Sequence, residues 1–164
     1  DFGNGLTAAV GYAGPENGIM TDESADAYGV NLAYTADNYG VSFTYGVLEV
    51  GVNENTYTAV NAYYSFENGM SISGGYETGS VEGGTDTEQW MVGLQWDEIG
   101  AGTLGVAIAT DGHQADNASD LYVYEAFYSY PMNDGMTITP IVFIREASST
   151  VDETGLILKT SFSF

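Results

Sequence analysis

The sequence predicts an all-β protein, an antiparallel transmembrane β-barrel with about ten strands in this chain. The chain is 44% hydrophobic with only 3 prolines, and Val, Thr and Tyr recur in its apolar stretches, which favours strands. Bulky apolar residues alternate with small or polar ones, so each strand has one apolar and one polar face. The alternating segments are about 8 to 11 residues long, the length that a tilted strand needs to cross a bilayer.

The first five expected strands lie in the N-terminal half. The alternation is plainest in 27–36 and 39–49, where nearly every second residue is Tyr, Val, Leu or Phe. The turns Asp37-Asn38 and Glu67-Asn68-Gly69 are short, whereas the connections 14–26 and 50–55 are longer. The five expected strands are 4–13, 27–36, 39–49, 56–66 and 69–78.

The last five expected strands repeat this design. Trp90, Val92, Leu94 and Trp96 alternate in the first of them, and Leu156, Leu158 and Phe162 share one face of the last. The connections 97–101 and 131–135 are short, whereas 79–86, 111–119 and 146–153 are longer. The five expected strands are 87–96, 102–110, 120–130, 135–145 and 154–164.

Short and long connections alternate, so they are expected at opposite ends of the sheet. An even number of strands then puts both ends of the chain on the short-connection side, as in bacterial outer-membrane barrels. Most of the 23 acidic residues lie in or beside the longer connections. Negative charge is therefore expected at one mouth of the barrel.

Composition excludes several functional classes. The formal net charge is -21, with only 2 Lys and Arg residues, which argues against nucleic acid as a partner because phosphate binding needs a basic surface. The sequence has no cysteine, so it has no disulfide, thiol nucleophile or thiolate metal site. No cofactor and no metal site is predicted. Because the chain begins at Asp1 rather than Met, we expect a processed or excised chain.

The periodicity alone leaves open which face meets water, because a soluble barrel or sandwich has the same alternation. Tyr and Trp recur near the strand ends, which is typical of the aromatic girdles at a membrane interface. The opposite face is rich in Gly, Ser, Thr, Asn and Gln, which fill a soluble core poorly. We therefore expect the polar face to point inward.

The inward parity predicts the residues that line a pore. The stems of Glu125 and Lys159 are expected roughly 10 Å apart, two strands from each other, where a water-bridged pair could select solutes. Phe162 and Phe164 look like the C-terminal aromatic signal by which outer-membrane barrels are recognised for assembly. The eight expected pore-lining residues are Asn31, Asn61, Glu77, Gln89, Gln95, Glu125, Arg145 and Lys159.

Two residues have competing interpretations. His113 is the sole histidine and lies near Asp111 and Asp116, which suggests acid–base or metal chemistry, but a surface loop position is the favoured prediction. Arg145 lies beside Glu146 near the outer mouth, and an exposed charge at the loop edge is favoured over a selective role.

The stretches 89–110 (QWMVGLQWDEIGAGTLGVAIAT), 124–140 (YEAFYSYPMNDGMTITP) and 152–164 (DETGLILKTSFSF) resemble the porins of cyanobacterial outer membranes. In these porins an S-layer-homology domain precedes a barrel related to carbohydrate-selective porins. The resemblance implies a barrel of about sixteen or more strands, so that residues 1–164 are one barrel domain and the C-terminal portion of a longer porin. This chain departs from the family in lacking the S-layer-homology domain and in offering only ten strands.

The resemblance also implies an outer membrane of a Gram-negative-type bacterium, passive diffusion of small hydrophilic solutes and inorganic ions, and no enzymatic activity. The implied partners are outer-membrane lipid, lipopolysaccharide, the barrel assembly machinery and two further copies in a homotrimer. The acidic mouth predicts a preference for cations.

Two alternatives remain from the sequence. A non-conducting structural, adhesive or receptor barrel is favoured if Phe127, Ile141 and Phe143 plug the lumen. An outer-membrane hydrolase requires His113 to approach at least one loop acid and a cleft between loops.

Overall fold

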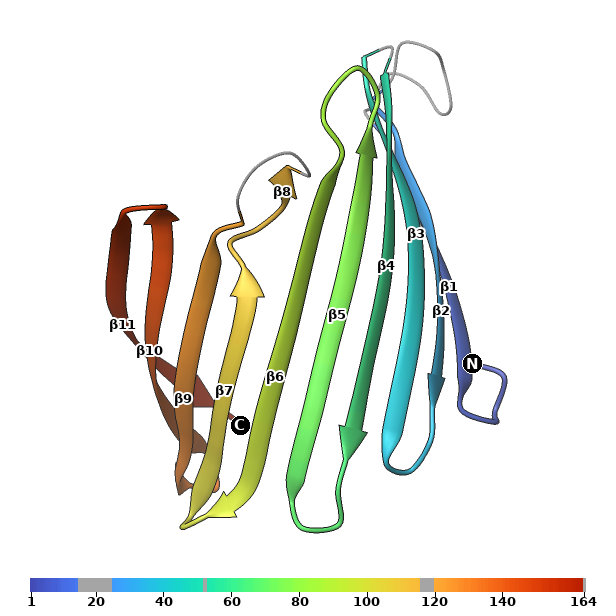
Figure 1. Ribbon diagram of the computed structural model, residues 1–164. Helices are drawn as coiled ribbons and strands as arrows, with labels where there is room; N and C mark the ends of the chain where they lie inside the picture. Colours follow the sequence, from blue (N-terminus) through green and yellow to red (C-terminus); the bar gives the residue numbers. More distant parts are fainter. Residues whose placement is uncertain (15–24, 52, 116–119, 164) are drawn as a thin grey trace.

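The computed structural model of the chain describes residues 1–14, 25–51, 53–115 and 120–163. These residues form one 11-stranded antiparallel sheet (Figure 1). No helix in the described ranges is long and apolar enough to cross a membrane. The strands are β1 (Leu6–Ala13), β2 (Ala27–Thr35), β3 (Tyr39–Val50), β4 (Asn53–Ser65), β5 (Met70–Val81), β6 (Thr87–Ile99), β7 (Gly102–Thr110), β8 (Gln114–Ala115), β9 (Tyr122–Asn133), β10 (Met136–Ser148) and β11 (Val151–Phe162).

Each long strand pairs with its neighbours in sequence, and the two-residue β8 pairs with β6. Among the described residues β1 pairs only with β2 and β11 only with β10, so the curved sheet has two open edges (Figure 1). Leu6 pairs with Tyr34 and Phe162 with Met136, so the start of β1 and the end of β11 both lie at the end of the sheet that carries the short turns. All ten expected strands are confirmed, and so is this placement.

Two of the expected long connections are tight turns. Val50 pairs with Asn53 in the β3–β4 hairpin, and Ser148 pairs with Val151 in the β10–β11 hairpin. The expected loops 50–55 and 146–153 are therefore wrong. The strands extend further because ladder hydrogen bonds use backbone groups and continue through polar residues. The expected loop 14–26 falls mostly on residues 15–24, which lie outside the described residues.

The outer part of β6 has an irregular partner. Met91 pairs with Ala109 of β7, but Thr87 pairs with Ala115 of β8, so two extra residues bulge from the β7–β8 side. Thr110 Oγ1 accepts a hydrogen bond from the Trp90 amide at 3.1 Å at this point. After the bulge, β8 continues the pairing with β6 in place of β7.

The register separates two faces of the sheet. Residues in line with Tyr28 form the apolar face, and residues in line with Asn31 form the polar face. Large apolar side chains are exposed, with Val10 at 84% and Leu156 at 76%, and Val47 is the only buried one among the described residues. A soluble sandwich buries its apolar face under a second layer, and the described residues supply no such layer.

Aromatic rings gather on the apolar face near both ends of the strands. At the short-turn end, the ring centroids of Tyr34 and Tyr39 lie 5.9 Å apart. At the opposite end, those of Trp90 and Tyr122 lie 5.8 Å apart, and the Tyr76 hydroxyl donates a hydrogen bond to Glu88 at 2.7 Å. Rings that combine an apolar body and a polar tip at these two levels are typical of membrane interfaces.

Candidate functional site

The register places all eight expected pore-lining residues on the polar face. Neighbouring strands share this parity, as when Glu77 of β5 pairs with Gln89 of β6 and Arg145 of β10 pairs with Glu153 of β11. The eight are Asn31, Asn61, Glu77, Gln89, Gln95, Glu125, Arg145 and Lys159.

Three of these residues lie around one small hollow. Asn61, Glu77 and Gln89 line a depression of about 230 Å³ in the polar face. Gln89 Nε2 donates a hydrogen bond to Glu77 Oε1 at 3.1 Å. The structure therefore collects a carboxylate and two amides on the central strands.

His113 joins this group from the connection between β7 and β8, where it is exposed, as expected of a surface loop residue. Its Nε2 lies 2.5 Å from Glu77 Oε1, and its ring centroid lies 5.8 Å from that of Tyr57 on β4. The bulge between β7 and β8 explains the contact with Glu77, because it returns the chain to the ladder of β6 at Gln114, directly after His113. The sequence gives no clear signal of this arrangement except Gly112, whose φ of 72° suits a sharp turn.

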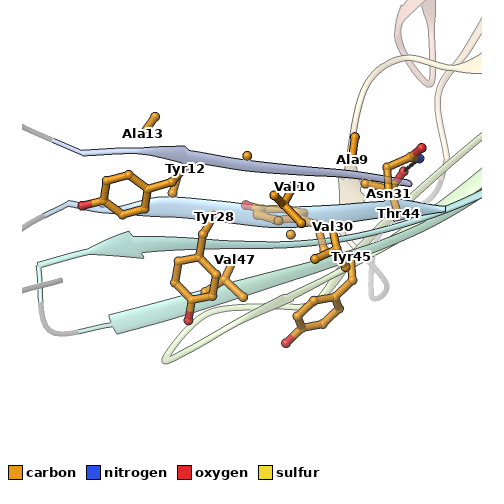
Figure 2. A pocket seen from close by; sticks show the side chains of 15 residues that line it. Ala9, Val10, Tyr12, Ala13, Tyr28, Val30, Asn31, Thr44, Tyr45 and Val47 are labelled. Carbon is orange, nitrogen blue, oxygen red and sulfur yellow. Dashed lines mark hydrogen bonds between the residues drawn. The ribbon is translucent and has the colours of Figure 1, made fainter. Parts of the chain in front are cut away.

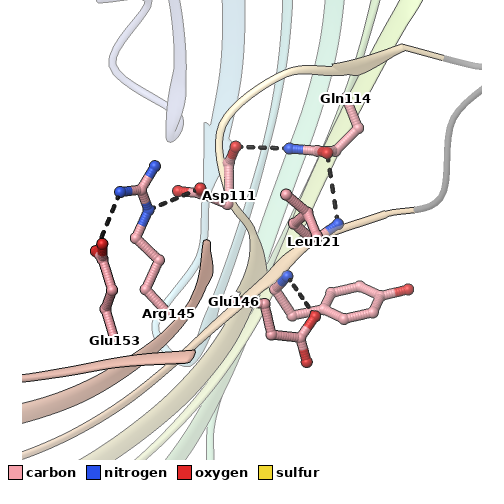
Figure 3. Close-up of polar contacts among 7 residues, drawn as sticks. Asp111, Gln114, Leu121, Arg145, Glu146 and Glu153 are labelled. Atoms are coloured by element: carbon pink, nitrogen blue, oxygen red, sulfur yellow. Dashed lines mark hydrogen bonds and ion pairs between the residues drawn. The ribbon is translucent and has the colours of Figure 1, made fainter. Parts of the chain in front are cut away.

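Arg145 forms a second polar group nearer the rim (Figure 3). Its Nε donates to Asp111 Oδ2 at 2.7 Å, and its Nη1 lies 3.5 Å from Glu153 Oε2. Gln114 Nε2 donates to the Asp111 carbonyl at 2.6 Å. Arg145 lies at the rim, as expected, but it is paired with two acids.

Glu125 and Lys159 are not level with each other. Glu125 lies in the row of Phe143 and Gly155, whereas Lys159 pairs with Thr139. The offset is four residues, or about 13 Å along the strands, so the expected water-bridged pair is wrong. The cause is that β9 continues to Asn133 through a register shift at its end, which raises Glu125 toward the long-connection side.

The remaining expected residues hydrogen-bond to their neighbours. Asn31 Nδ2 donates to Thr44 Oγ1 at 2.8 Å, and Gln95 Nε2 donates to Asp97 Oδ1 at 3.1 Å. Phe162 lies on the apolar face opposite Met136. Phe164, the other part of the expected assembly signal, lies outside the described residues.

The polar face near β1 bears mostly small side chains. Strands β1 to β4 border a hollow of about 560 Å³ whose lining includes Ala9, Ala13 and several glycines. Figure 2 shows Tyr28 and Tyr45 on one side of these strands and Ala9 and Ala13 on the other. Small side chains on the polar face leave open space above this part of the sheet.

The large rings on the polar face lie against glycines of neighbouring strands. A Cβ at Gly105 would collide with the ring of Phe127, and a Cβ at Gly155 would collide with the ring of Phe143. The two rings therefore lie along the sheet over these glycines. This arrangement reduces how far they project from the wall.

Negative charge gathers at the long-connection end, as expected. Arg145 is the only Lys or Arg there, since Lys159 lies toward the other end. The described acids at this end are Asp26, Glu49, Glu54, Glu77, Glu82, Asp86, Glu88, Asp111, Asp120, Glu146, Asp152 and Glu153.

Comparisons with known proteins agree with this architecture. A family model described as Gram-negative porin matches residues 1–140. No curated protein sequence matches the chain.

Solved structures of low sequence identity share the fold. The anion-selective porin from Comamonas acidovorans is 17% identical, with a TM-score of 0.78 over 98% of this chain and 56% of that chain. A mutant of the Rh. blastica porin is 16% identical, with a TM-score of 0.71 over 98% of this chain and 52% of that chain. The KdgM porin in complex with disordered oligogalacturonate is 10% identical, with a TM-score of 0.56 over 97% of this chain and 92% of that chain. The chain thus spans about half the length of the first two.

Proposed function

Because the chain belongs to the Gram-negative porin family, we propose that it forms part of the wall of an outer-membrane pore for passive diffusion of small hydrophilic solutes and inorganic ions. The carrying observation is the two-faced single sheet. Its apolar face is exposed and ringed by aromatic side chains, as lipid contact requires. Its polar face bears small and hydrogen-bonding side chains, which suit a water-filled lumen.

The pore is proposed to be larger than these ten long strands. The edges at β1 and β11 carry unpaired backbone groups, which cannot face hydrocarbon, so each edge needs a partner, and we propose that further strands supply it. The better superposition on about half of a larger porin chain than on most of the KdgM chain supports this proposal. About sixteen strands leave an aqueous channel, whereas about eight leave a lumen filled by side chains. Residues 1–164 then form one portion of a single barrel domain.

Cation preference is proposed from the charge of this chain. Its net charge is -21, and the acids gather at one mouth, where they raise the local concentration of cations. The Comamonas acidovorans porin is anion-selective, but that property is not carried over, because 17% identity supports only the common fold.

We also propose what surrounds the pore. A bacterial outer membrane supplies lipid and lipopolysaccharide on the apolar face, and the barrel assembly machinery inserts the chain. A homotrimer and a cyanobacterial source rest on the resemblance of the stretches 89–110, 124–140 and 152–164 and remain predictions.

The two rival functions have different support. The rings of Phe127 and Phe143 lie over glycines, which argues against a lumen plugged by these residues. The hydrolase alternative required His113 to approach a loop acid and a cleft between loops, whereas its acidic partner Glu77 lies within β5. A His113→Ala variant that loses a measurable peptidase activity would support a hydrolase, whereas an unchanged background rate would remove it.

Planar-bilayer recording tests the proposed pore. The full polypeptide that carries this sequence is reconstituted, and single-channel currents and reversal potentials are measured in a KCl gradient. Stable steps with a potassium-to-chloride permeability ratio above one are expected. Silence from correctly folded protein would favour the non-conducting barrel, and a ratio below one would overturn the cation preference alone.

A further inference from the structure

The contact between His113 and Glu77 joins a residue of the β7–β9 connection to the wall of the sheet. Both His113 Nε2, at 2.5 Å, and Gln89 Nε2, at 3.1 Å, reach the same Oε1 of Glu77. The imidazole also packs beside the Tyr57 ring. His113 is thus positioned by partners on β4 and β5.

The backbone explains why this position is specified. The bulge after β7 inserts Asp111 and Gly112, and Gly112 adopts a φ of 72°, which a glycine takes without steric cost. The Gln114–Ala115 pair with β6 then holds the segment on the sheet. Gln114 further donates to the Asp111 carbonyl, while Arg145 holds the Asp111 carboxylate. Both sides of His113 are therefore anchored.

The neighbouring charged residues determine what the contact between His113 and Glu77 does. Arg145 already lies between Asp111 and Glu153, so it is engaged with other acids. The Glu77 side chain is 24% exposed and that of His113 is 44% exposed. His113 is therefore a solvent-exposed partner on the Glu77 carboxylate, which itself remains partly exposed.

We propose that His113 is a selectivity-determining residue that covers Glu77 and weakens the attraction of this carboxylate for passing cations. The inference rests on the proposed pore function. A protonated imidazole compensates the charge of Glu77, and a neutral one still occupies one carboxylate oxygen as a hydrogen-bond donor. The site would take small hydrated cations when His113 is absent.

Reversal potentials of the full polypeptide test the proposal through a double-mutant cycle. His113→Ala is expected to raise the potassium-to-chloride permeability ratio roughly two- to fivefold, the range that an exposed charge pair supplies. Glu77→Gln is expected to lower the ratio, and His113→Ala in the Glu77→Gln background is expected to change nothing more. Asp37→Asn, which makes the same charge change in a turn at the other end of the sheet, is the matched control and is expected to lower the ratio less.

A second readout needs no conduction. His113 is the sole histidine of these 164 residues, and comparison with His113→Ala identifies its imidazole NMR signals in the full polypeptide. Glu77→Gln is expected to move these signals, and Asp37→Asn is expected to leave them in place.

The two readouts separate the two possible failures. Channels that conduct with a ratio indifferent to His113→Ala would overturn the inference and leave the pore intact. Silence of the wild type would overturn the proposed function and the selectivity role with it, and the NMR signals would then report whether the contact itself exists. Signals that ignore Glu77→Gln would overturn the contact on which the inference depends.

Discussion

Arg145 on β10 donates a hydrogen bond to Asp111 at the end of β7, with 2.7 Å between Nε and Oδ2, although β9 lies between their strands. The contact crosses the polar face near the acidic end of the sheet. It connects the start of the segment that carries His113 to β10.

Replacing this arginine is expected to increase cation preference. Arg145→Met keeps the apolar stem but leaves Asp111 and Glu153 without their cation. The potassium-to-chloride permeability ratio should rise by up to roughly fivefold at low salt, as expected for one charge at contact distance in water, and less at high salt because of screening.

The matched control for Arg145 is the other cation of the chain. Lys159→Met removes the same charge on the same face, but farther from the acidic end, so a smaller rise is expected. Equal ratios for the two variants would contradict a specific role for the pairing of Arg145 with acids at the rim.

Glycine substitutions test where the aromatic rings lie. Gly105→Ala places a methyl group where the Phe127 ring lies, and the ring is expected to swing away from the wall into the lumen. Single-channel conductance should fall, because the ring then occupies part of the aqueous cross-section. Gly11→Ala adds the same methyl group on the same face with nothing within 4 Å, so its conductance should match that of the wild type.

Neighbouring residues of β6 test which face meets lipid. Val92 lies on the apolar face and Met91 on the polar face, both near the middle of the strand. Val92→Arg is expected to destabilise the folded barrel by about 2–4 kcal/mol, the cost of an arginine at the bilayer midplane. Met91→Arg should cost much less, because its side chain meets water.

Denaturant unfolding in lipid vesicles measures both variants of β6. Equal losses of stability would mean that the two faces do not differ in their surroundings, which contradicts a membrane-spanning wall.

The sequence predicted what depends on strand period. Alternation assigns each residue to a face as soon as a strand is recognised, which is why residues as far apart as Asn31 and Lys159 were placed correctly on one face. Arrangements that depend on register were not predicted. The extension of β9 to Asn133 moves Glu125 away from the level of Lys159, and no local pattern marks such a shift.

The contact of His113 with Glu77 was not predicted, for a related reason. The residues around it are polar and resemble a loop, but a two-residue bulge returns the chain to the ladder of β6 at Gln114. Backbone pairing decides this, and composition does not report it. The same cause made the β3–β4 and β10–β11 hairpins longer than expected.

The last prediction concerns Phe162 as an assembly signal. Phe162 lies on the apolar face opposite Met136. Replacing Phe162 can therefore lower the amount of folded barrel in two ways, through lost recognition by the assembly machinery or through a lost contact within the sheet. Phe162→Ala is expected to reduce the amount of folded barrel in cells more than Met136→Ala does. In detergent micelles, the two variants are expected to refold equally well. The measurement is the folded fraction by heat-modifiable gel mobility in both settings. Equal folded fractions of the two variants in cells would mean that Phe162 acts only as part of the sheet. A recognition signal must matter where the machinery is present, and Met136, the cross-strand partner of Phe162, does not carry that signal.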